Sequence, residues 1–192
     1  MSANLGDGLH RKRIQHFNIP GHAHFLTFTC YHGMPLLANE LWSSWLGESM
    51  RAACNKHRFA LWAYVFMPEH VHVLVRPGEE NYDVSTWLKS VKSSVSKRVI
   101  EELKRKRDPL LQQLEIASPV GAPRYRFWQD GPGYDRNIFD IQSAAEKARY
   151  THRNPVRRGL VDSPDAWRWS SFRWIEQGQR DAEPLRLDDW IE

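Results

Sequence analysis

Two β-rich runs lie back to back near the middle of the chain: FALWAYVFMP, residues 59–68, and HVHVLVRP, residues 70–77. Aromatic and β-branched residues dominate both runs, as is typical of strands in a pleated sheet. Pro68 ends the first run, because a proline cannot donate to a central ladder. The stretch therefore predicts two adjacent strands joined by a tight connection.

The segments on either side alternate between strand and helix patterns. Phe and Thr alternate in HFLTFTCY, residues 24–31, with the period of two that a half-buried strand shows. Apolar residues recur at near-helical spacing over residues 41–57, and at steps of three and four from residue 84 to 107. We therefore expect a strand and a helix before the central pair, and an amphipathic helix after it.

A further strand and helix complete the predicted core. The run RYRFWQ, residues 124–129, has the composition of a short strand, and the GPG at 131–133 predicts a turn. Ser143 and Glu146 have the spacing of a capping box at the start of a helix. We expect this helix to run to about Asn154, because a proline follows it.

The order strand, helix, strand, strand, helix, strand, helix predicts an α+β fold, a ferredoxin-like antiparallel sheet with helices packed on one face. With 192 residues and 41% hydrophobic content, the chain is long enough for one sizeable core and short for two domains. We therefore expect residues 1–192 to form a single domain. Its core spans about residues 16–161, and a Trp-rich C-terminal extension, residues 162–192, packs on that core.

The composition narrows the class of protein only modestly. A net charge of +4 is mildly basic, and such an excess is common among proteins that bind no nucleic acid, so the cations matter only where they cluster. Cys30 and Cys54 have neither the number nor the spacing of a disulfide framework or a cysteine zinc site, and we expect small core residues in a reducing compartment. No stretch approaches the roughly 18 consecutive apolar residues of a membrane span. We expect a soluble cytoplasmic protein with no membrane partner.

His70 and His72 form the strongest local signal for chemistry. Residues i and i+2 of a strand point to the same face, so both imidazoles project side by side while Val71 packs on the other face. Two neutral imidazoles held in this way can share one divalent metal ion. The alternative is two half-exposed strand histidines without a ligand, since isolated H-x-H pairs are common.

Tyr150 and Asn154 form a second pair, in ARYTHRNPVRRGLV, residues 148–161. They are four residues apart near the end of the predicted helix, so their side chains lie on one face and can address one site. His152 points roughly away from that face, and we do not assign it to the metal. The alternative is a packing tyrosine with a wet hydroxyl and an asparagine that ends the helix.

In combination, these motifs resemble one family, the REP-associated tyrosine transposases, a branch of the single-tyrosine HUH transposases. The matching segments lie between about residues 16 and 174: HFLTFTCY, WAYVFMPEHVHVLV, WLKSVKSSVSKRV, RFWQDGPGYDRNI and RYTHRNPVRRGLVDSPDAWRWSS. The resemblance implies the HUH fold. It matches His70 and His72 to the metal-binding histidines, Tyr150 to the nucleophile and Asn154 to the polar residue that completes the metal site.

The resemblance also implies a metal-dependent enzyme that cleaves single-stranded DNA at palindromic hairpins and transfers the strand. Tyr150 would form a 5′-phosphotyrosine intermediate, whose ester bond conserves the energy for rejoining. Mg²⁺ or Mn²⁺ is the expected cofactor, because an oxygen ligand and substrate phosphates suit a hard cation. A phenol with a pKa of about 10 is mostly protonated at neutral pH, so Tyr150 needs help, and the neighbouring Glu69 is a candidate helper.

The basic surface of the predicted helix from 84 to 107 is expected to contact DNA phosphates, together with cations near Tyr150. The candidate contact residues are Lys89, Lys92, Lys97, Arg98, Arg157 and Arg158. The alternative for the helix is a solvated surface. The expected partner is single-stranded or hairpin DNA with palindromic repeats, bound by a monomer or a homodimer that is nucleoid-associated in the cytoplasm.

Two other functions stay open on the sequence. A metal nuclease would use the same ligands with water as the nucleophile, and it would form no covalent intermediate. A domesticated, non-catalytic regulator would bind palindromic repeats without cleaving them. The intact set of His70, His72, Tyr150 and Asn154 argues against the regulator. A tyrosine one helical turn before a ligand argues against the nuclease, which has no need of it.

Overall fold

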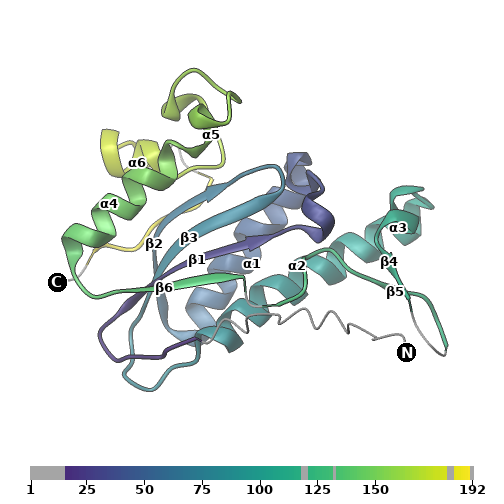
Figure 1. Cartoon of the computed structure of the whole chain (residues 1–192), viewed down its shortest axis with the longest axis horizontal. Helices are drawn as coiled ribbons and strands as arrows, with labels where there is room; N and C mark the ends of the chain where they lie inside the picture. Colours follow the sequence, from purple (N-terminus) through teal and green to yellow (C-terminus); the bar gives the residue numbers. More distant parts are fainter. Residues whose placement is uncertain (1–15, 118–120, 132, 181–183, 191–192) are drawn as a thin grey trace, which may run out of the picture.

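A four-stranded antiparallel sheet with the strand order β2-β3-β1-β6 organises the chain. The computed structural model describes residues 16–117, 121–131, 133–180 and 184–190. The strands of this sheet are Ala23–Thr29 (β1), Phe59–Phe66 (β2), His70–Pro77 (β3) and Tyr134–Ile138 (β6) (Figure 1). One helix joins β1 to β2 and another follows β3, as in the βαββαβ arrangement of ferredoxin-like folds. The antiparallel α+β prediction is confirmed.

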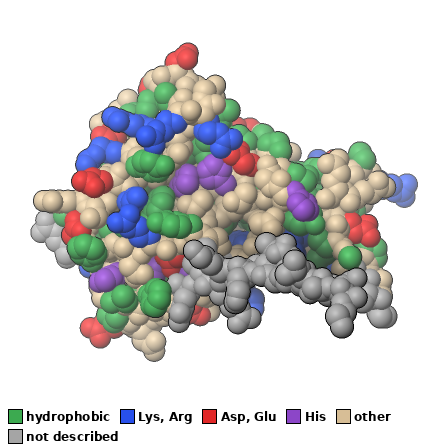
Figure 2. Space-filling model, viewed as in Figure 1, with side chains coloured by type: hydrophobic (Ala, Val, Ile, Leu, Met, Phe, Trp, Pro, Cys, Tyr) green, Lys and Arg blue, Asp and Glu red, His purple; other side chains and the backbone are tan. Residues whose placement is uncertain are grey.

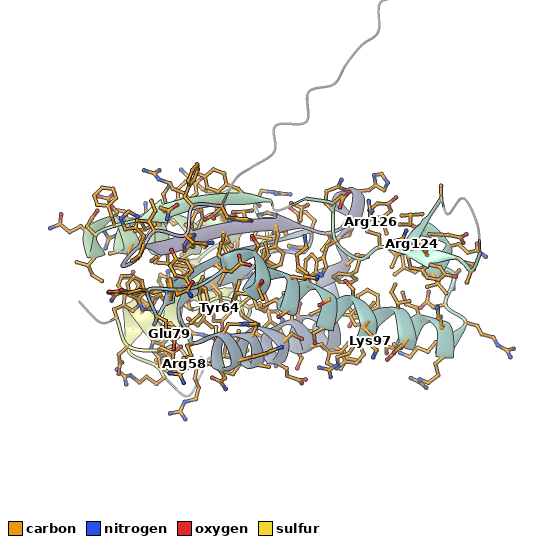
Figure 3. The ribbon with its side chains drawn as sticks, turned by 90° about the horizontal axis from the view of Figure 1, so that it is seen from below. Arg58, Tyr64, Glu79, Lys97, Arg124 and Arg126 are labelled. Atoms are coloured by element: carbon orange, nitrogen blue, oxygen red, sulfur yellow. The ribbon has the colours of Figure 1, made fainter. Side chains whose placement is uncertain are left out.

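Three long helices pack on this sheet, at Glu40–His57 (α1), Val84–Lys106 (α2) and Ile141–His152 (α4). The first two cover one face, as expected, and Figure 3 shows this helical layer beneath the strands. The third lies on the opposite face, against β2, β3 and β6. The expectation of helices on one face therefore holds for α1 and α2, and α4 adds a partial layer on the other.

The alternation of residues along β3 separates the two faces. Its valines are fully buried in the cluster formed with α1 and α2. Leu74 points the other way and packs with Ala144 and Ala148 of α4. Because side chains of a strand alternate, His70 and His72 share the face of Leu74. The small alanines let α4 approach this face closely, which brings the helix to the histidine side of the sheet.

The fourth strand of the sheet differs from the prediction. Within residues 124–129 only Arg124–Tyr125 (β5) is a strand, and it pairs with Glu115–Ile116 (β4) in a separate two-stranded ribbon. The sheet is completed instead by β6, after the predicted turn. This strand reads YDRNI, and because it lies at an edge with mostly polar residues, it carries no clear hydrophobic alternation.

Gly133 makes the approach to β6 possible. Its φ is +78°, and a Cβ added there would lie 2.1 Å from the carbonyl oxygen of Thr27. Only glycine lets the backbone pass β1 this closely in this conformation. The predicted GPG turn thus has a second function, since it delivers the chain to the edge of the sheet.

The helix that carries Tyr150 begins earlier than its predicted capping box. The N-cap of α4 is Asp140, whose carboxylate accepts hydrogen bonds from the Ser143 backbone N–H (2.7 Å) and hydroxyl (2.6 Å). The capping box at Ser143 and Glu146 was therefore wrong. Aspartate at this position satisfies a free N–H and favours the helix dipole, so it takes the role that the spacing assigned to serine.

Shorter elements connect and extend this core. They are η1 Tyr31–Gly33, η2 Leu36–Ala38, α3 Leu110–Gln113, α5 Asn154–Arg157, η3 Pro164–Ala166 and α6 Phe172–Gln177. The residues after 161 cover the free edge of β2, where the Phe66 N–H donates to the Trp169 carbonyl at 2.8 Å. Leu185 and Leu187 then bury in the main core. The extension thus closes an edge that would otherwise present unpaired backbone groups.

Two further predictions concern the cysteines and membrane-spanning segments. Cys30 and Cys54 are both free and buried, as small core residues are. Among the helices in the described parts of the chain, none combines the length and apolar character needed to cross a membrane.

Candidate active site

His70 and His72 lie side by side on the α4 face of β3, each half-buried. Their rings are nearly perpendicular, at 85°, with centroids 4.7 Å apart. The two Nε2 atoms approach to 3.0 Å. Figure 2 shows this face of the molecule, on which histidine side chains gather near the middle with cationic and acidic side chains next to them.

Partners behind the rings determine which nitrogen each histidine offers. His70 Nδ1 lies 3.0 Å from Glu69 Oε1, and His72 Nδ1 lies 2.8 Å from Thr27 Oγ1. The ring of Phe25 stacks on His72 at 5.7 Å and 11°. Hydrogen bonds of this kind hold a metal-binding histidine in one tautomer and orientation, with the other nitrogen free for the ligand. With both Nδ1 atoms engaged in this way, the two Nε2 atoms, 3.0 Å apart, are the nitrogens available to a metal.

Burial keeps both imidazoles in the form that binds a metal. Burial, with a smaller contribution from the neighbouring charge of His70, lowers the pKa of His72 to about 3. Burial also lowers the pKa of His70, although Glu69 opposes this. Neutral imidazole is the metal ligand, so at neutral pH protons do not compete for these nitrogens.

The distance between the two nitrogens fits a divalent ion of octahedral preference. With metal–nitrogen bonds of about 2.1 Å, two ligands 3.0 Å apart subtend an angle of roughly 90°. The described residues contain no group of three or more His, Cys, Asp or Glu arranged around a metal. Further ligands would therefore come from another residue type or from the substrate.

Tyr150 lies on α4 with 48% of its surface exposed. The Arg157 guanidinium carbon is 4.8 Å from the centre of its ring, and Lys147 Nζ is 5.5 Å from it. The same Lys147 Nζ is 5.6 Å from the ring of Phe25, which stacks on His72. A continuous set of contacts therefore links the tyrosine to the histidine pair, and two cations flank its accessible ring.

Asn154 begins α5 directly after the helix of Tyr150. Its Nδ2 donates to the carbonyls of Thr151 at 3.1 Å and Tyr150 at 3.4 Å, so the amide nitrogen closes the end of α4. The amide oxygen is the atom that a hard cation prefers. The described contacts of Asn154 place it beside Tyr150 and do not join it to His70 or His72.

Glu69 joins the histidine strand to the segment after Tyr150. Its Oε1 accepts a hydrogen bond from Arg158 Nη1 at 2.7 Å as well as the contact from His70. Burial would raise the pKa of Glu69, but the charges and hydrogen bonds of His70 and Arg158 outweigh it and lower the pKa below its ordinary value. The Glu69 carboxylate is therefore already engaged by His70 and Arg158, and it holds both side chains in place.

The candidate DNA contacts fall into two separate groups. Arg157 and Arg158 lie beside Tyr150 and Glu69. The other candidates lie on α2, which covers the opposite face of the sheet, and Figure 3 shows Lys97 on this helical layer. Lys92 donates to the carbonyls of Gln129 and Gly131 at 3.3 and 3.2 Å. The cations of α2 and those beside Tyr150 therefore belong to segments that pack on opposite faces of the sheet.

Arg98 is also engaged within the protein. Its Nη1 donates to Glu48 Oε2 at 2.5 Å, and its guanidinium lies over the ring of Trp45 at 4.6 Å. Lys89 and Lys97 are exposed. Of the candidates on α2, these two lysines have the more accessible side chains for a phosphate.

The sequence analysis assigned no role to three residues of the site: Phe25, Thr27 and Lys147. The alternation in residues 24–31 puts Phe25 and Thr27 on one face of their strand. Only the pairing of β1 with β3 brings Thr27 opposite His72. Lys147 precedes Tyr150 by three residues, and this helical spacing was a usable sign that the two lie close together.

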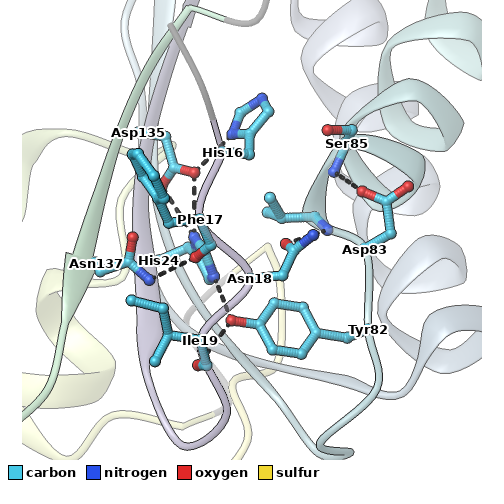
Figure 4. Close-up of polar contacts among 11 residues, drawn as sticks. His16, Phe17, Asn18, Ile19, His24, Tyr82, Asp83, Ser85, Asp135 and Asn137 are labelled. Carbon is cyan, nitrogen blue, oxygen red and sulfur yellow. Dashed lines mark hydrogen bonds and ion pairs between the residues drawn. The ribbon is translucent and has the colours of Figure 1, made fainter.

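A second histidine cluster, shown in Figure 4, belongs to the other face of the sheet. Asp135 accepts from His16 Nδ1 at 2.6 Å and from His24 Nδ1 at 2.9 Å. His24 is fully buried, and its Nε2 lies 2.9 Å from the Tyr82 hydroxyl, which donates to the Ile19 carbonyl. This network fastens the segment before β1 to β6 and to the start of α2.

The family comparison agrees with this geometry. A family model described as "Transposase IS200 like" matches residues 20–114, which include both histidines of β3. A curated Haemophilus influenzae protein named "Putative REP-associated tyrosine transposase" is 23% identical over 125 residues. That match covers 65% of this chain, and the chain spans 65% of the relative's length.

A solved structure agrees over nearly the whole chain. It is described as "Structure of the REP associates tyrosine transposase bound to a REP hairpin" and matches with a TM-score of 0.63. The match covers 94% of this chain and 92% of that one at 19% sequence identity, and thus shows a common fold. Motifs, fold and family model agree: the chain is similar to the IS200-like transposases over residues 20–114, and it resembles the REP-associated tyrosine transposases in sequence and fold.

Proposed function

We propose that this protein is a metal-dependent transposase that cleaves and rejoins single-stranded DNA beside a hairpin, with Tyr150 as its nucleophile. The observation that carries the proposal is the pair of Nε2 atoms 3.0 Å apart, linked through Phe25 and Lys147 to an accessible tyrosine. The similarity to a REP-associated transposase solved with a REP hairpin supports the choice of hairpin DNA as the partner.

His70 and His72 would hold a Mg²⁺ or Mn²⁺ ion, with the amide oxygen of Asn154 as a further ligand. When bound, the ion would neutralise charge on the scissile phosphate and polarise the phosphorus. Glu69 and Thr27 orient the two rings from behind. We therefore assign Glu69 a positioning role, because its carboxylate is already held by Arg158 and His70.

In the proposed reaction, Tyr150 supplies the nucleophile. Its Oη attacks the phosphorus, the bond to the 3′ oxygen breaks, and the phenolic proton is lost as the leaving 3′ oxygen gains one. The product is a 5′-phosphotyrosine and a free 3′-hydroxyl, and attack by a 3′-hydroxyl reverses the step without ATP. Arg157 and Lys147, which flank the tyrosine ring, are placed to attract the phosphate backbone.

An adduct assay tests the proposal. The purified protein is incubated with hairpin oligonucleotides from palindromes near its own gene, labelled at the 3′ end, with Mg²⁺ or Mn²⁺. We expect a denaturant-resistant labelled adduct that disappears with a chelator and with Tyr150→Phe. Cleavage without an adduct would support the water-using nuclease instead. Binding without cleavage would support a non-catalytic regulator of palindromic repeats.

A further inference from the structure

A cavity of about 410 Å³ lies behind the helix of Tyr150, between the α4–α5 segment and the C-terminal extension. Its apolar wall consists of Val156, Pro164 and Phe172. In Figure 1, α6 lies beside α4, so the extension supplies the outer wall. The volume is within the range of small-molecule sites, and it is large enough for one nucleotide.

The rim of the cavity is cationic. Arg149, Arg153 and Arg157 line it at intervals of four residues, and all three are exposed. Glu176 is the acidic member of the lining, so the rim keeps an excess of positive charge. Guanidinium groups bind phosphate oxygens in a bidentate manner and stack on flat rings. The rim therefore suits a phosphodiester strand, and the apolar wall suits a base.

A buried histidine in the lining has an unpartnered nitrogen. His152 is 1% exposed, and its Nε2 lies 2.9 Å from Ser171 Oγ, which also bonds the backbone of Tyr64. His152 Nδ1 has no hydrogen-bond partner. Its ring packs edge-on to Phe172 at 5.6 Å. Buried polar atoms almost always have a partner, so Nδ1 of this cavity-lining residue keeps a hydrogen-bonding capacity that the described residues leave unused.

Arg157 connects the cavity to the proposed nucleophile. It lines the cavity, and it also lies over the Tyr150 ring at 4.8 Å. The arginine rim of the cavity therefore begins beside the proposed nucleophile.

We propose, resting on the proposed function, that this cavity receives one unpaired nucleobase from the nucleotide next to the scissile phosphate. The base would lie against Phe172 and Val156, with its polar edge at His152 and its phosphates on the arginines. Enzymes that act on nucleic acids commonly read a base that has left its stack in this way, by aromatic packing and hydrogen bonds to its edge.

A scan of abasic positions along the DNA, repeated with a protein variant whose cavity is filled by a larger side chain, tests this inference. Hairpin oligonucleotides with one abasic position, moved stepwise along the unpaired flank, are bound to the full chain carrying Tyr150→Phe, and fluorescence anisotropy gives Kd. We expect one position at which loss of the base weakens binding about tenfold, the scale of one stacked base. Adding Val156→Trp should reduce that effect to less than about twofold. Leu160→Trp, on the same segment but outside the lining, should leave it intact.

Each outcome has a distinct meaning. A flat scan with retained hairpin binding, or the same tenfold step in Val156→Trp, overturns the base pocket and leaves the proposed function standing. Failure to bind any hairpin overturns both. Should Val156→Trp fail to fold by circular dichroism, photocrosslinking of 5-iodouracil at the sensitive position decides the question. A crosslink to the peptide of His152 or Phe172 supports the pocket, and a crosslink confined to other peptides refutes it.

Discussion

Replacing Thr27 by valine tests most directly whether the hydrogen bond behind the His72 ring supports metal binding. In the tautomer that leaves Nε2 free, His72 Nδ1 carries the proton and donates to Thr27 Oγ1 at 2.8 Å. Valine keeps the shape of threonine and its preference for strands, so it removes the acceptor without opening a cavity. A buried donor left unpaired costs about 1–3 kcal/mol. Alternatively the ring moves its proton to Nε2, where it competes with the metal.

Both routes weaken metal binding, and we expect the Kd for Mn²⁺ to rise about 10- to 100-fold, the range for lost outer-shell partners. Isothermal titration calorimetry or Mn²⁺ electron paramagnetic resonance measures this without any DNA. Thr29→Val is the matched control, because Thr29 lies on the same face of β1, opposite His70. An unchanged Mn²⁺ affinity in Thr27→Val, or an equal loss in the control, would refute the reasoning.

Three further predictions concern the nucleophile, acid stability and the edge of the sheet. Tyr150→Phe should bind hairpin DNA within about twofold of the wild type, because it removes only an exposed hydroxyl, and a Kd raised tenfold in anisotropy would contradict this. Burial lowers the pKa of His72 to about 3 and of His152 to about 4. The unfolded chain therefore binds protons at these histidines below pH 6.5 while the folded chain does not, and the free energy of unfolding should fall by up to about 1.4 kcal/mol per pH unit for each as the pH drops toward 4. Urea titrations at pH 7 and pH 5 check this, and equal values would argue against it. Gly133→Ala should lower the melting temperature well below that of Gly178→Ala, since both have positive φ but only the first meets backbone at 2.1 Å, and equal melting temperatures would show that β6 shifts freely.

Local periodicity was sufficient for most of the core. The period of two in residues 70–77 put both histidines on one face, and spacing in steps of three and four located α2 almost to the residue. These signals work because the side chains of one strand or helix alternate by geometry, whatever surrounds them. The same argument predicted Tyr150 and Asn154 near the end of one helix, whereas α4 ends at His152 and Asn154 begins α5.

Errors arose where the decisive contact was distant in the sequence. The fourth strand of the sheet, β6, is polar and lies at an edge, so only its pairing with β1 identifies it as a strand. The prediction therefore assigned this strand to residues 124–129, of which only Arg124–Tyr125 is a strand. The role of the basic surface of α2 in DNA binding stays a prediction, but its place in the fold could not be predicted. No local pattern shows that α2 covers the opposite face of the sheet from the histidines.

The sequence by itself determined which functional groups are available: two imidazoles on one strand face, and a tyrosine with an amide one turn later. What only the tertiary structure decided is how these groups are held. Strand register supplies Thr27 to His72, helix packing on the α4 face carries Lys147 to Phe25, and chain reversal after α4 brings Arg158 to Glu69. The physical reason is that side-chain direction follows from local backbone geometry, whereas register and packing are determined by contacts between segments that lie far apart in the sequence, more than a hundred residues in the case of Phe25 and Lys147.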